Sequence, residues 1–345
     1  MNAYIDIVTS ELRWESAPGT PWNWYSFVVP DKCQKCIWYI KKEEVNKYLM
    51  ESNKWITIKT IDNIKWRSFL QSMHGGAIAC GKDHIYLINR LERLMVIRKN
   101  NFSFKIIEPK EQNSGYTRCE CVVINDKLNV HGGFWNDHHL VWDQDDERFE
   151  LVHDLKQEIE WTGIAQHTLI QTTDKTVFSF GGNDIKGRGR NDIYFLNDKG
   201  KQWTKLSDVK LPAKLRNLGI TVVVKGKCIL LFGGEQDTEK GDHHPWVDSN
   251  EIYIFDIKLS KLRKSKMNCP LKGRPKAMTF CKENELAVSG YLREQWKNNK
   301  LDSYKFPPQY LVKIMEHYYV TEWIHLIYNN FEMKHFKIRV VDILK

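Results

Sequence analysis

The chain has 345 residues, of which 42% are apolar and 12% aromatic, so it can bury a large core. No apolar run approaches the roughly 18 residues of a membrane-spanning helix, which argues against a helical membrane protein. The net charge is +9 with 43 acidic residues interspersed, a mild excess that favours acidic partners without requiring nucleic acid.

The first third of the chain consists of short apolar segments separated by polar turns. Residues 10–16 resemble a strand that precedes a Gly-Pro turn. The segments YSFVV, CIWYIK, VNKYLM and WITIKT predict a four-stranded unit over about 24–60. GGAIAC, HIYLIN, RLMVIR and SFKIIE predict a second unit over about 73–108. Alternation of apolar and polar residues over four to eight positions is typical of half-buried strands.

Three later stretches share one pattern: an apolar strand, a glycine pair, a polar loop and a second alternating strand. They are LNVHGGFW, VFSFGGND and ILLFGGEQ, and their first glycines are Gly132, Gly181 and Gly233. The spacings are 49 and 52 residues, and the last two pairs are followed by Asn-[Asp/Glu]-Ile-Tyr. A period near 50 with several strands per unit indicates a propeller array. We therefore predict further units over about 118–152, 166–206 and 216–264.

This pattern resembles the kelch repeat, in which an apolar strand, Gly-Gly, a variable loop and an aromatic-rich strand recur. A glycine pair lets the backbone turn through positive φ and lets neighbouring strands approach closely. The resemblance implies an all-β fold, a six-bladed kelch-like β-propeller in one domain over 1–345. Its last blade would cover about 274–345, and residues 1–17 would close the ring, which removes exposed sheet edges.

The C-terminal part departs from the repeat. Pro307 and Pro308 suit the start of a helix. The apolar residues that follow recur at helical spacing, at Leu311, Ile314, Met315 and Tyr318. We therefore predict a small helical insertion or module over 306–327.

One face of such a ring collects the candidate binding residues. Antiparallel alternation places the loop between the second and third strands on the same face as the loops that join successive units. Long loops on a rigid scaffold are the usual place for binding. The candidates for partner binding are Arg118, Arg188, Arg190, Arg216, Lys240, Arg274, Trp135, Trp246 and His243. Stacking on a neighbouring blade is the structural alternative for the arginines at the start of inner strands.

These residues predict a non-catalytic scaffold that binds an acidic or phosphorylated segment of another protein. Guanidinium groups pair bidentately with carboxylate or phosphate, and tryptophan supplies apolar anchors beside them. Some kelch propellers bind acidic peptides through arginines on this face, so the resemblance implies the same. We expect no cofactor and no membrane partner. Nucleic acid is not favoured, because the positive charges are spread over the whole chain.

The alternative is a metal-dependent enzyme of the iron lyase or oxidase type. Glu235, Glu239 and His243 follow E-x-x-x-E-x-x-x-H, similar to the E-x-x-x-D-x-x-x-H iron motif of plant kelch specifier proteins, with a different middle residue. Carboxylates with an imidazole suit Fe(II). Cys33-x-x-Cys36 could be half of a zinc site, but no second pair matches it.

The remaining sequence features concern location. Several of the eight cysteines lie inside apolar strands, as reduced core thiols do. The N-terminus carries charges where a secretory signal needs an apolar stretch. We expect a cytoplasmic protein, with the nucleus as an alternative.

Overall fold

The structure is a computed structural model. It describes residues 27–31, 36–49, 54–73, 76–89, 93–108, 118–133, 138–154, 164–172, 174–184, 186–196, 202–223, 228–238, 246–268, 275–282, 285–290, 309–315, 320–329 and 332–334. Antiparallel strands account for nearly all of the regular structure in these ranges.

The first two sheets each have four strands in chain order. The first sheet contains β1 (Phe27–Asp31), β2 (Cys36–Ile40), β3 (Glu44–Leu49) and β4 (Lys54–Thr60). The second contains β5 (Ala77–Cys80), β6 (His84–Ile88), β7 (Leu94–Arg98) and β8 (Phe104–Ile107). These strands lie within the ranges in which alternation predicted them.

The third and fourth sheets have the same plan. The third contains β9 (Glu120–Ile124), β10 (Lys127–His131), β11 (His138–Asp143) and β12 (Arg148–Asp154). The fourth contains β13 (Thr168–Gln171), β14 (Val177–Phe180), β15 (Asp192–Leu196) and β16 (Trp203–Lys210). A register shift in the pairing of the outer two strands is common to both sheets.

The fifth sheet carries a small additional sheet on its loops. The fifth sheet contains β18 (Gly219–Val223), β19 (Cys228–Phe232), β22 (Glu251–Asp256) and β23 (Lys261–Asn268). The small sheet contains β17 (Leu215–Arg216), β20 (Glu235–Asp237) and β21 (Trp246–Asp248) in that order. It is formed by the segment that enters the fifth sheet and by the long loop after Gly234.

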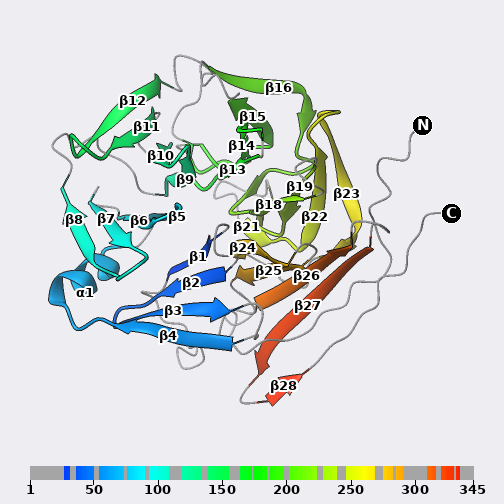
Figure 1. The fold of residues 1–345 in the computed structure, drawn as a ribbon. Coiled ribbons are helices and arrows are strands. Elements are labelled where there is room, and N and C mark those ends of the chain that lie inside the picture. The colour runs from blue at the N-terminus through cyan, green and yellow to red at the C-terminus, as the bar shows by residue number, and fades with distance from the viewer. Residues whose placement is uncertain are drawn as a thin grey trace.

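The sheets are arranged around a common centre, and the chain advances round the ring from blue to red (Figure 1). The inner strands touch in a closed cycle, from β1 to β5, β9, β13, β18, β24 (Pro275–Lys282) and back to β1. Apolar side chains therefore fill the wedges between neighbouring sheets, and no single sheet buries its own two faces alone.

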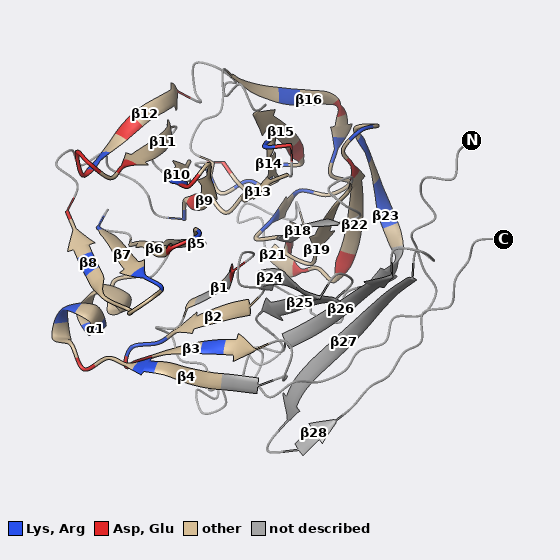
Figure 2. Ribbon diagram, in the orientation of Figure 1, with Lys and Arg blue, Asp and Glu red and all other residues tan. Residues whose placement is uncertain are grey.

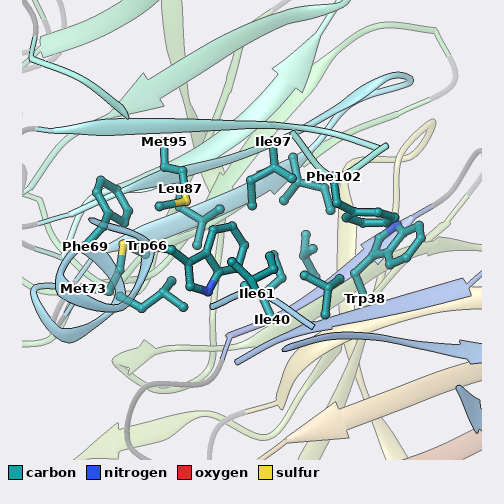
Figure 3. Close-up of a cluster of buried hydrophobic side chains, with 14 of the residues drawn as sticks. Trp38, Ile40, Ile61, Trp66, Phe69, Met73, Leu87, Met95, Ile97 and Phe102 are labelled. Atoms are coloured by element: carbon teal, nitrogen blue, oxygen red, sulfur yellow. The ribbon is translucent and has the colours of Figure 1, made fainter. Parts of the chain in front are cut away.

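The wedge between the first and second sheets shows how this packing works. Trp38, Ile40, Leu87 and Phe102 meet there, with Trp66 fully buried at the middle (Figure 3). Trp66 belongs to α1 (Ile64–Gln71), a helix that the sequence analysis did not predict. The helix links the two sheets and buries an aromatic-rich face in the wedge. Within the described ranges, no helix has the length and hydropathy needed to cross a membrane.

Helix α1 begins at a well-formed cap. The side chain of Asn63 accepts hydrogen bonds from the backbone N–H groups of Lys65 and Trp66. The indole Nε1 of Trp66 donates to the carbonyl oxygen of Lys41 at 3.0 Å. A capping asparagine and an anchored tryptophan fix the start and the orientation of this short helix.

The glycine pairs have the backbone conformation expected of them. Gly181 and Gly182 have φ of +61° and +96°, and Gly233 and Gly234 have +56° and +85°. The N–H of Gly182 donates to the carbonyl oxygen of Leu215 in the next repeat at 2.7 Å. The N–H of Gly133 likewise donates to the carbonyl oxygen of Ile164 at 2.7 Å, so the pairs of the third and fourth sheets lie against the backbone that enters the following sheet.

The helix predicted over 306–327 is wrong. The last sheet has the order β24, β25 (Glu285–Gly290), β26 (Gln309–Met315), β27 (Val320–Asn329) and β28 (Glu332–Lys334). The segment 320–328 is rich in β-branched and aromatic residues, which favour strands, and β25 offers an edge to which β26 pairs over five residues. Tertiary pairing therefore overrides the helical spacing.

The predicted closure of the ring involves residues 1–17, which lie outside the described residues. The position outside β26 in the last sheet is occupied by β27, which pairs with it from Gln309↔Leu326 to Met315↔Val320. The C-terminal part of the chain thus supplies the outer strands of the last sheet.

Candidate functional site

Three residues at equivalent positions, each just before the inner strand of its sheet, are linked by backbone hydrogen bonds on one face of the ring. We call this series of bonds the ladder. Arg118, Gln166 and Asn217 precede β9, β13 and β18, and their φ values are 63°, 57° and 53°. The N–H of Gln166 donates to the carbonyl oxygen of Arg118 at 3.0 Å, and that of Asn217 donates to the carbonyl oxygen of Gln166 at 2.8 Å. Left-handed backbone at non-glycine residues is held only where neighbouring structure supports it. The ladder therefore fixes the relative positions of the three entrances.

Arg118 is presented at the start of this ladder. Its side chain is exposed, and Nη1 donates to Oε1 of Gln166 at 3.2 Å. The same glutamine thus holds both the backbone and the side chain of Arg118. This predicted binding residue has the exposure that binding requires.

Arg188 is held by a turn built around Asp184. Oδ1 of Asp184 accepts the backbone N–H groups of Lys186 and Arg188, both at 2.9 Å. Oδ2 pairs with Nε and Nη2 of Arg188 at 2.8 and 2.7 Å. The arginine side chain is 55% exposed, and among the described residues its Nη1 bonds to no group. One edge of the guanidinium is therefore neutralised, and the other faces solvent.

Arg190 points inward instead. It pairs with Asp192 at 3.2 Å and donates to the hydroxyl of Tyr194 at 3.1 Å. Lys205 pairs with the other oxygen of Asp192 at 2.7 Å. Burial alone would raise the pKa of Asp192, but Lys205 and Arg190 hold it below its ordinary value. Arg190 therefore serves the fourth sheet rather than a partner.

The fifth sheet repeats this arrangement. Glu251 pairs with Lys264 and accepts a hydrogen bond from the hydroxyl of Tyr253. Burial is the main cause that raises the pKa of Tyr253 above its ordinary value, and Glu251 adds to it. In both sheets, the acidic residue of the Asn-[Asp/Glu]-Ile-Tyr signature therefore pairs with a lysine from the outer strand.

Arg216 is also engaged within the protein. Its Nε lies 2.9 Å from Oε2 of Glu235, and its guanidinium carbon lies 3.7 Å from the ring centroid of Trp246. The side chain of Asn217 donates to the same oxygen of Glu235 at 2.8 Å. Glu235 is fully buried. The cation–π contact and the ion pair therefore join the three strands of the small sheet, β17, β20 and β21.

The loops of the fourth and fifth sheets are bonded to each other. The N–H of Gly189 donates to Oδ2 of Asp237 at 2.9 Å. The N–H of Asp237 donates to the carbonyl oxygen of Lys214, and that of Leu215 donates to the carbonyl oxygen of Arg190. A side chain at Gly189 would overlap Asp237 and Trp246. This face is therefore a braced surface and not a set of independent loops.

Of the predicted binding residues that the structure describes, Arg118 and Arg188 are exposed. Arg190, Arg216 and Trp246 have internal contacts. The remaining predicted residues, Trp135, Lys240, His243 and Arg274, lie outside the described residues, as do Glu239 and Cys33 of the two metal alternatives. Lys and Arg segments are interspersed with Asp and Glu segments along the described strands of the ring (Figure 2).

Of the three candidate iron ligands the structure describes Glu235, and its side chain is already bonded to other residues. Glu235 is buried and its Oε2 already accepts from Arg216 and Asn217. Among the described residues, no three His, Cys, Asp or Glu side chains converge as metal ligands. Burial raises the pKa of the Cys36 thiol to about 12, which disfavours the thiolate that zinc requires.

The sequence analysis missed the residues that brace this face. Gln166 and Asp237 bond to groups of a neighbouring repeat, whereas Asp184 acts within its own turn, and only the Asp184–Arg188 spacing of four is visible in sequence. It also missed a group of buried histidines between the third and fourth sheets, described below.

Comparison with known proteins gives a fold. No protein family and no curated protein matches the sequence. A solved structure described as "Structure of YjhT" is similar, with a TM-score of 0.66 and 12% identity over 90% of this chain and 99% of that one. The chain has a β-propeller-like, all-β fold. In total 1056 solved chains match it, so the fold by itself does not single out an activity.

Proposed function

We propose that this chain is a six-bladed, kelch-like β-propeller and a non-catalytic scaffold that binds an acidic or phosphorylated segment of another protein. The closed cycle of inner strands and the glycine pairs support the blade count and the repeat type. The cysteines of the described part are free thiols, which suits a reducing compartment such as the cytoplasm or nucleus.

The braced loop face carries the proposal. Arg118 and Arg188 are both exposed there, and each is fixed by a neighbour, Gln166 for the first and Asp184 for the second. A side chain that is already ordered loses less conformational entropy on binding, so it contributes more to affinity. The solvent-facing edge of Arg188, with Nη1, suits a carboxylate or phosphate oxygen. Asp184 reduces the local charge, which favours a short, correctly placed acidic segment over any polyanion.

The first test is a peptide array. Full-length protein should bind acidic and phosphorylated peptides more tightly than their neutral counterparts. Arg118→Ala and Arg188→Ala should each weaken binding to the selected peptide by about 1–3 kcal/mol, the range for charge-assisted hydrogen bonds. Rising salt should lower the association rate. Isothermal titration with the selected peptide measures the affinities.

Lys186→Ala is the matched control. Lys186 is exposed on the same turn, and only its backbone N–H is bonded to Asp184. This variant should bind within about twofold of wild type, since a lone solvated lysine contributes little. Equal binding of neutral and acidic peptides, or full affinity in both arginine variants, would move the interaction surface elsewhere.

A further inference from the structure

Four histidines are buried together between the third and fourth sheets. His131 ends β10, His139 lies in β11, His153 lies in β12, and His167 lies just before β13. None is more than 4% exposed. We call these four residues the histidine cluster. Trp203, at the start of β16, packs against it.

The contacts of the histidine cluster cross the junction of the two sheets. Nδ1 of His131 lies 2.8 Å from Nε2 of His167. The ring of His131 packs on that of Trp203 with centroids 4.6 Å apart, and His139 stacks on His153 at 5.3 Å. The third sheet therefore contacts the fourth through imidazole rings rather than through aliphatic side chains alone.

The hydrogen bonds of His139 define its protonation. The indole Nε1–H of Trp203 can only donate, so Nδ1 of His139 accepts it at 3.4 Å and carries no proton. Nε2 then carries the proton and donates to Oδ1 of Asn129 at 2.9 Å. A second proton, on Nδ1, would point at the indole N–H. Protonation of His139 thus breaks its contact with the fourth sheet.

The pair His131–His167 has the same property. One of the two ring nitrogens donates and the other accepts, whichever tautomers are present. A proton on the accepting nitrogen would place two N–H groups face to face at the same distance. It would also add a positive charge beside three other imidazoles in a buried site.

Among the described residues, two carboxylates lie on strands next to the histidine cluster. From β9, half-buried Glu120 lies opposite His131 in the register. From β12, Asp154 lies opposite His138, the neighbour of His139, and β16 contributes uncharged Trp203. Burial lowers the pKa of His131, which the other imidazoles lower further, and burial lowers the pKa of His139 and of His167 to about 3 each. Neutral imidazoles are therefore required for this packing.

We propose that the histidine cluster is an acid-sensitive latch, which holds the third and fourth sheets together at neutral pH and opens their junction at mildly acidic pH. In the opened state the imidazoles of His131, His139 and His167 reach water and titrate near pH 6.5. Below that value the opened state binds more protons than the closed one. The closed state is thus fully stable above about pH 6.5 and loses stability as the pH falls.

The expected effect of pH on the opening equilibrium is large. Each histidine that must be neutral in the closed state shifts the opening equilibrium by up to about tenfold per pH unit below pH 6.5. Three such residues give up to about a thousandfold per unit. Ordinary carboxyl groups titrate near pH 4, so the interval from pH 7.5 to 5.5 isolates the histidines.

Hydrogen exchange of the full chain, measured by mass spectrometry at pH 7.5 and 5.5 and corrected for the intrinsic rate, tests the latch. The protection factors of peptides from β10, β11 and β13 should fall at least about tenfold at pH 5.5. Peptides from the first and second sheets should change less. Uniform loss of protection around the ring, or none, would overturn the proposal.

The variant His139→Gln/His167→Gln keeps polar groups but removes two titrations. Its unfolding midpoint in guanidinium chloride should fall less between pH 7.5 and 5.5 than that of wild type. His84→Gln, at a half-buried histidine in the second sheet, is the matched control and should keep most of the wild-type pH dependence. Equal pH dependence in the double variant and wild type contradicts the latch. If the double variant does not fold, the exchange result for wild type decides.

Discussion

Replacing Gly182 with valine is expected to lower the free energy of unfolding by about 3 kcal/mol or more. Gly182 has a φ of +96°, which a β-branched residue avoids. A Cβ atom there would lie 2.9 Å from both the carbonyl oxygen of Ala165 and Cβ of His167. That carbonyl accepts the N–H of Asn183 at 2.9 Å, so it cannot move away without breaking a hydrogen bond within the fourth repeat. Denaturant unfolding at constant m-value measures the loss.

Gly187→Val separates the two causes of this loss. Gly187 has a φ of +76°, but nothing lies within 4 Å of its missing Cβ. Gly187→Val should therefore lower the free energy of unfolding only through backbone strain, by about 1 kcal/mol. Gly234→Val should resemble Gly182→Val, because its Cβ would lie 2.6 Å from the carbonyl oxygen of Arg216. A Gly182→Val protein as stable as the Gly187 variant would show that the glycine pairs are not packed as described.

The strands could be predicted because their signals are local. Alternation and the glycine pairs act within a few residues, and β1 to β11 lie inside the ranges given from these signals, whereas β12 and β16 extend past them to Asp154 and Lys210. Helix α1 was not predicted because it has only eight residues and begins shortly after β4, and its apolar face is recognisable only once the wedge between two sheets is known. The C-terminal strands β26 and β27 were mistaken for a helix because their apolar spacing fits both periods.

The candidate site could be predicted by face but not by residue. The chain order of the strands determines which loops share a face: Arg118 precedes β9, Arg188 lies between β14 and β15, and both are exposed. Which arginines are free depends on partners from other segments. Glu235 is 19 residues from Arg216, and its burial cannot be read from its acidic surroundings in sequence. The same holds for the histidine cluster, where His131 and His167 are 36 residues apart.

Buried polar contacts recur at the wedges between sheets, and they have a shared consequence. Apolar packing alone would tolerate small rotations of one sheet against the next, since it has little directionality. Ion pairs and hydrogen bonds such as Lys99–Asp31 and His131–His167 require one arrangement. A rigid ring of this kind presents its loops at fixed positions, which is the property that the proposed scaffold needs.

Lys99→Met is expected to destabilise the protein by about 3–5 kcal/mol, the cost of leaving a buried charge without the group that faces it. Nζ of Lys99 lies 2.8 Å from Oδ2 of Asp31, and both side chains are at most 3% exposed. The same ammonium donates to the carbonyl oxygen of Gly81 at 2.7 Å, and Nε1 of Trp38 donates to Asp31 at 2.9 Å. The lysine therefore joins the second sheet to the first from inside the wedge.

Two further variants make this prediction specific. Asp31→Asn combined with Lys99→Met removes both charges, so it should recover part of the stability that the single variant loses. Lys105→Met removes the exposed pair Lys105–Glu147, which also links neighbouring sheets, and should cost less than about 1 kcal/mol because water screens it. Denaturant unfolding of the three variants at pH 7.5 gives the comparison. If Lys99→Met costs no more than Lys105→Met, the buried pair does not hold the first two sheets together.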